Sequence, residues 1–156
     1  MRPNYFIIHG SFGSPFVNWL PWLRRELRRR GKEVYTPDFP TGVGFQNYDN
    51  WNKLLKVYLD AGLITEDTTI FAHSIAPVFI SKFLIEHQVH VKKLVFVCGF
   101  NNYTGIDEEY DSAVLNDCNL WEIDAGKSII ALGVFLLSSG TCYYLAAKHD
   151  IDAMCS

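Results

Sequence analysis

The sequence lacks the cysteine and charge patterns typical of metal-binding, disulfide-stabilised or nucleic-acid-binding proteins. Its four cysteines form no C-x-x-C pair and do not cluster with histidines, so no metal site is expected and a reducing, cytoplasmic location is favoured. The net charge is only −3, which gives no electrostatic reason to expect nucleic acid or an anionic membrane as a partner.

The chain shows no internal repeat and no low-complexity tract, and no secretory leader is expected. Its first apolar run is only a few residues long and ends at His9-Gly10, which does not resemble a signal peptide. With 156 residues and 49% hydrophobic content, the chain is long and apolar enough for one domain over 1–156 with a substantial core.

Two segments permit more than one interpretation. Residues 24–32 carry five arginines and one lysine, which could form a basic patch, but leucines at core spacing between them favour a solvated helix face. Residues 128–147 contain no charge and meet the length of a membrane span. Small and polar residues at 138–142 interrupt that run, so a buried strand or helix is preferred to a membrane anchor.

What is present is a regular alternation of strand-like and helix-like segments over the first hundred residues. Short apolar runs are typical of parallel strands buried on both faces, and glycines follow the amphipathic segments where helices end. Strands are predicted at 5–9, 33–37, 68–73 and 93–99, and helices at 19–30 (capped by Asn18), 48–61 and 75–87. This order predicts an α/β fold with three layers: a mostly parallel sheet with helices on both faces.

The most informative segment is Ala72-His73-Ser74-Ile75-Ala76, where a strand-like run meets a helix-forming one at a serine. The pattern is close to the G-x-S-x-G nucleophile elbow, with alanine at both glycine positions. Small residues are needed there because strand and helix nearly touch while the serine adopts a strained backbone conformation. A serine that merely caps the helix is the plainer alternative, but it does not explain the small flanking residues.

Acyl transfer by serine also needs donors for the oxyanion that develops in the transition state. The Ile75 N–H, at the start of a helix, is one predicted donor. The second is predicted in the glycine-rich loop after the first strand, from the N–H of Ser11 or Phe12. In that loop His9 is expected to brace the backbone, and His73 is expected to pack or to form hydrogen bonds rather than to act as the base.

Taken together, these motifs resemble the compact α/β-hydrolases that include YdeN-type proteins and the retinoblastoma-binding serine hydrolases. The resemblance covers about residues 4–116 and includes the HG loop, the Ala-His-Ser elbow and the strand around 93–100. It implies a serine hydrolase resembling a carboxylesterase, with Ser74 as nucleophile, a small-molecule ester or acyl substrate and no cofactor.

Residues 117–156 depart from that family. They contain no Gly-His pair for the base and no family acid loop, so the fold is expected to be a truncated α/β-hydrolase. His149 and Asp124 are weak candidates for base and acid. The alternative is a non-catalytic protein of the same fold that binds a ligand or partner. An incomplete sheet would also expose an edge through which copies of the chain could pair.

Overall fold

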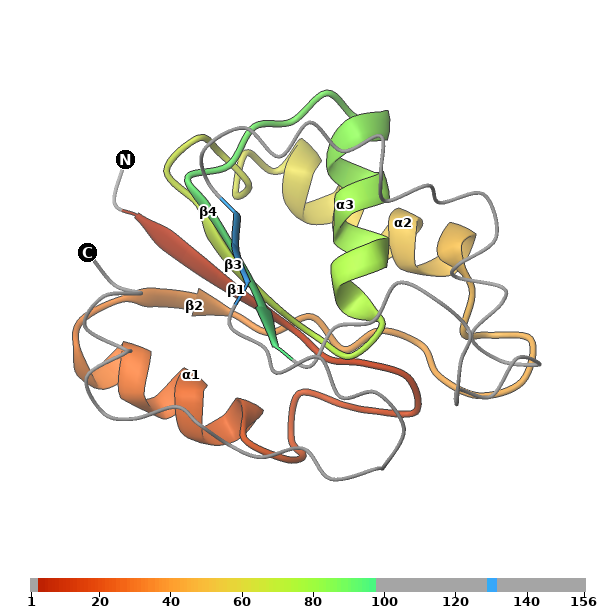
Figure 1. Cartoon of the computed structure of the whole chain (residues 1–156), viewed down its shortest axis with the longest axis horizontal. Coiled ribbons are helices and arrows are strands. Elements are labelled where there is room, and N and C mark those ends of the chain that lie inside the picture. The colour runs from red at the N-terminus through yellow and green to blue at the C-terminus, as the bar shows by residue number, and fades with distance from the viewer. Residues whose placement is uncertain (1–2, 98–128, 132–156) are drawn as a thin grey trace.

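The computed structural model describes residues 3–97 and 129–131, and these residues build a five-stranded parallel sheet (Figure 1). The strand order is β2-β1-β3-β4-β5, so β1 and β3 lie side by side near the centre. The strands span Asn4–Ile8 (β1), Glu33–Tyr35 (β2), Thr69–His73 (β3), Lys93–Val97 (β4) and Ile129–Ala131 (β5).

Helices cover both faces of this sheet, which confirms the predicted three-layer α/β class. Helix α1 (Leu20–Arg29) lies on one face, and α2 (Tyr48–Asp60) and α3 (Ala76–Glu86) lie on the other (Figure 1). Strands β1, β2 and β3 are each followed by a helix that returns the chain to the start of the next parallel strand, as this topology requires.

The alternation of side chains along β1 divides the core into two parts. Tyr5 and Ile7 pack with the buried leucines of α1, whereas Phe6 and Ile8 pack with α2 and α3 on the opposite face. All five residues of β1 are buried, as expected for a central strand of a parallel sheet.

The helix boundaries agree with the sequence predictions except at the start of α1. Gly31 and Gly62 follow α1 and α2 with φ of 72° and 70°, a conformation that glycine adopts without a steric cost. The prediction that Asn18 caps α1 is wrong. Trp19 occupies the cap position without a side-chain hydrogen bond, and Asn18 itself has φ of 57°. Its left-handed backbone places it in the preceding turn instead.

The arginine-rich segment forms the solvated face of α1, as preferred above. Leu20, Leu23 and Leu27 are buried against the sheet, while Glu26 pairs with Arg29 and Arg30 at 2.8 and 3.0 Å. These hydrogen bonds lower the pKa of Glu26 to about 2.

Only three residues of the uncharged segment 128–147 are described, and they form β5 beside β4. The remainder of that segment lies outside the described residues. Among the described helices, none is both long enough and apolar enough to span a membrane.

Candidate active site at the ends of strands β1 and β3

The parallel register of β1 and β3 brings together the two motifs that the sequence analysis singled out. Ile8 pairs with Ala72, so the loop that begins at His9 and the turn at Ser74 leave the same edge of the sheet. Gly10 lies against Ser74: a Cβ atom added at Gly10 would be 2.5 Å from the Ser74 Cβ and 3.1 Å from its Oγ. The glycine-rich loop is therefore in van der Waals contact with the serine.

Ser74 sits in the turn between β3 and α3 with a left-handed backbone. Its φ is 61°, which is unfavourable for a residue with a Cβ and costs on the order of 1–2 kcal/mol. The Ser74 N–H donates to the Val97 carbonyl at 3.1 Å, which extends the β3–β4 pairing and holds this conformation. Ala72 and Ala76 on either side are fully buried, so larger residues would not fit there.

The capping alternative for Ser74 does not apply. Ile75 is the residue at the cap position of α3, and no side chain caps that helix. Pro77 lies in the first turn of α3, where its missing N–H costs no intrahelical bond. The Ser74 side chain is partly exposed, and no hydrogen bond to its Oγ occurs within the described part of the chain.

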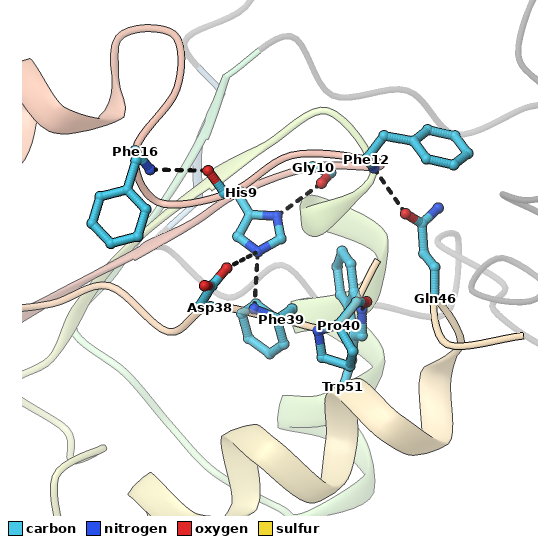
Figure 2. A network of polar contacts seen from close by, with 10 residues as sticks. His9, Gly10, Phe12, Phe16, Asp38, Phe39, Pro40, Gln46 and Trp51 are labelled. Carbon is cyan, nitrogen blue, oxygen red and sulfur yellow. Dashed lines mark hydrogen bonds and ion pairs between the residues drawn. The ribbon is translucent and has the colours of Figure 1, made fainter. Parts of the chain in front are cut away.

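His9 braces the adjacent loop through both ring nitrogens (Figure 2). Its Nε2 accepts a 2.9 Å hydrogen bond from the Phe39 N–H, so the ring proton is on Nδ1. That Nδ1 lies 2.9 Å from the Gly10 carbonyl oxygen and donates to it. His9 thus connects the end of β1 to the chain segment after β2, in agreement with its expected role.

Burial lowers the pKa of His9, and its hydrogen bond to Gly10 and the nearby Asp38 only partly oppose this effect. His9 is accordingly neutral at neutral pH, which is the form that the bond from Phe39 requires. The 3.9 Å approach of Asp38 Oδ1 to Nε2 is therefore not an ion pair at that pH. A buried neutral imidazole fixed at both nitrogens positions the backbone and is not available as a general base.

The two candidate amides in the glycine-rich loop differ in their surroundings. The Gly10 carbonyl accepts from His9 Nδ1 and, at 3.1 Å, from the Gly13 N–H. The peptide between Gly10 and Ser11 is trans, so the Ser11 N–H points away from those two donors. The Phe12 N–H donates to Gln46 Oε1 at 2.8 Å, a contact between loops that the sequence did not predict.

The predicted donor on the other side of the site is the Ile75 N–H at the N-terminus of α3. Helix N-termini leave their first amides without intrahelical acceptors. No acceptor among residues 3–97 and 129–131 is hydrogen-bonded to the Ile75 N–H. The start of α3 thus provides a donor adjacent to Ser74 in the chain.

Neither His73 nor His87 is hydrogen-bonded to Ser74 Oγ within the described part of the chain. The His73 ring stacks edge-on against Trp19 at 5.5 Å, and burial lowers its pKa. His87 Nε2 is hydrogen-bonded to Asn52 Oδ1 at 2.7 Å, at the C-terminal end of α3 and far along the helix from Ser74. His149 and Asp124, the candidates for base and acid, lie outside the described residues.

Comparisons with known proteins identify the fold. No protein-family model matches the sequence, and no curated protein matches it significantly. Among solved structures, the YdeN gene product of B. subtilis has 26% identity and a TM-score of 0.54 over 64% of this chain and 53% of its own. An extracellular α/β-hydrolase from a Paenibacillus species has 22% identity and a TM-score of 0.52 over 65% of this chain and 43% of its own.

A bromoperoxidase from Bacillus anthracis is similar at 18% identity, with a TM-score of 0.55 over 75% of this chain and 44% of its own. The fold of the described residues is that of the α/β-hydrolases. The predicted partial match to this family, of which YdeN is a solved example, is confirmed. The chain spans about half the length of these relatives.

Proposed function

We propose that the protein is a serine hydrolase of small ester or related acyl substrates, with Ser74 as the nucleophile. The observation that carries this proposal is the contact of Gly10 with a partly exposed serine whose φ is 61°. A strained serine between a strand and a helix, with a glycine-rich loop against it, is the local geometry that acyl transfer on this fold requires.

In the proposed reaction Ser74 Oγ attacks the acyl carbon and its proton passes to a base. The C–O bond to the leaving alcohol then breaks as the alcohol takes up a proton, and water later hydrolyses the acyl-enzyme. The oxyanion is stabilised by the Ile75 N–H and by one amide of the loop, Ser11 or Phe12. The proposal places base and acid outside the described residues, where the sequence offers His149 and Asp124.

Two exposed aromatic side chains support a substrate with an apolar acyl group: one on the glycine-rich loop and one on the loop hydrogen-bonded to it. Phe12, two residues after Gly10, is 54% exposed. Phe45, next to the Gln46 that binds the Phe12 amide, is 63% exposed. Exposed aromatic rings on the glycine-rich loop and on the loop bonded to it favour an uncharged, apolar group over a charged one.

A fluorophosphonate probe tests the proposal, because it phosphonylates only serines that are activated for attack. We expect one adduct on the wild-type protein, mapped by peptide mass spectrometry to Ser74 and absent from Ser74→Ala. Ser81→Ala is the matched control, since the Ser81 hydroxyl is buried in α3 without a hydrogen-bond partner among the described residues. Its labelling should equal that of the wild type.

Absence of labelling in a folded wild-type protein would overturn the proposal and leave the non-catalytic alternative. Labelling that persists in Ser74→Ala would place the nucleophile elsewhere. Continuous hydrolysis of a short-chain ester, abolished by Ser74→Ala, would show that the serine supports repeated turnover and not only a single reaction with the probe.

A further inference from the structure

Gln46 is a buried polar side chain that no motif explains. Only 3% of its surface is exposed, although it lies in the loop between β2 and α2 and is flanked by the exposed Phe45. A buried amide needs hydrogen-bond partners, and the Gln46 Oε1 finds one in the Phe12 N–H at 2.8 Å (Figure 2). The two residues are 34 positions apart, so this contact joins the loop after β1 to the loop between β2 and α2.

The loop that carries Gln46 is itself held in place. The Gln46 N–H donates to the Gly42 carbonyl at 3.0 Å. The next residue, Asn47, caps α2 by accepting the Asn50 N–H at 2.9 Å and also donates to the Gly44 carbonyl at 3.1 Å. Gln46 is therefore anchored to the start of a helix and presents its side chain from a fixed backbone.

The bond to Gln46 determines how the loop beside Ser74 presents its amides. Phe12 has φ of 50°, a conformation that needs external support in a residue with a bulky side chain. In a trans peptide the N–H and C=O point in opposite directions, so holding the Phe12 N–H fixes the whole Ser11–Phe12 unit. The preceding unit is fixed by His9 through the Gly10 carbonyl.

We infer that Gln46 is a positioning residue for the oxyanion loop. It holds the Phe12 amide away from the reacting atoms, so the loop contributes the Ser11 N–H, opposite the Ile75 N–H. His9 binds the carbonyl of the Gly10–Ser11 peptide, and Gln46 binds the N–H of the next peptide, between Ser11 and Phe12. This inference rests on the proposed function, because an oxyanion loop has a role only if Ser74 reacts.

The test compares the kinetics of fluorophosphonate inactivation in two variants at residue 46. Gln46→Met keeps the length of the side chain but removes the acceptor for the Phe12 N–H. The loop should then present the Ser11 amide less accurately, so the maximal inactivation rate should fall about 10- to 100-fold with little change in the half-saturating probe concentration. Gln88→Met changes the other glutamine of the chain, which is exposed, and should leave both constants unaltered.

Gln46→Glu keeps an acceptor for the Phe12 amide and adds a titratable charge beside the proposed oxyanion loop. Its inactivation rate, divided by that of the wild type at each pH, should fall as the carboxyl ionises with rising pH. The ratio cancels the titration of the enzyme's own base, and a purely structural role would not produce this slope.

The possible outcomes distinguish a failure of the proposed function from a failure of the positioning role of Gln46. If the wild type is not labelled, the proposed function fails and the role of Gln46 falls with it. If the wild type is labelled but folded Gln46→Met reacts at the same rate, or loses only probe affinity, the positioning role alone is refuted. Should Gln46→Met not fold, the Gln46→Glu ratio decides: a flat pH profile rejects the role and a falling one supports it.

Discussion

A single methyl group added at residue 10 should remove most of the reactivity of Ser74. The added Cβ of Gly10→Ala would lie 2.5 Å from the Ser74 Cβ and 3.0 Å from the His73 carbonyl oxygen. Neither atom is the free end of a flexible side chain, so the loop or the turn must shift. A displaced loop loses its oxyanion donor, and the fluorophosphonate labelling rate should fall at least about 100-fold.

Gly62→Ala is the control that separates reactivity from stability. Gly62 has φ of 70° and open space around it, so alanine there strains the backbone by about 1 kcal/mol without touching the site. This variant should unfold at lower urea concentration and label at the wild-type rate. A Gly10→Ala protein that labels as fast as the wild type would show that the loop contributes nothing to the reactivity of Ser74.

Phe79→Ala should cause the largest loss of stability, because Phe79 packs α3 against α2 and against the segment that contains Phe39. Its ring contacts those of Phe39, Tyr48, Trp51 and Phe83 at centroid distances of 5.2–6.1 Å, and the side chain is fully buried. Truncating a buried phenylalanine costs about 3–5 kcal/mol. Small domains are stable by only about 5–15 kcal/mol, so much of the total would be lost.

Urea unfolding followed by far-UV circular dichroism measures this effect. Val57→Ala on α2 is the comparison, since Val57 is 63% exposed and its truncation should change the free energy of unfolding by less than about 0.5 kcal/mol. A loss below 1 kcal/mol for Phe79→Ala would mean that the aromatic cluster does not hold α3 against the sheet.

The centre of the sheet was predictable because β1 and β3 are buried almost completely and, like β4, consist of short apolar runs. Such runs are typical of parallel strands, and glycines at 31 and 62 mark the ends of the helices before them. The cap of α1 was mispredicted because asparagine favours both helix caps and left-handed turns. At Asn18 the turn conformation prevailed.

The site was only partly predictable. Ser74, Ile75 and the HG loop follow from local patterns, since a strand, a small residue and a helix start are adjacent in the chain. The His9–Phe39 and Gln46–Phe12 hydrogen bonds join residues 30 and 34 positions apart, and no local sequence pattern predicts them. The side-chain contacts between loops depend on how β1, β2 and α2 are placed, which requires the folded structure.

The most direct test of the account is a crystal structure of the fluorophosphonate adduct. We expect phosphorus bonded to Ser74 Oγ, with the phosphoryl oxygen about 2.7–3.1 Å from the Ser11 and Ile75 nitrogens and the Phe12 N–H still on Gln46. A phosphoryl oxygen that contacts neither of those two amides, or an adduct on a different residue, would contradict it.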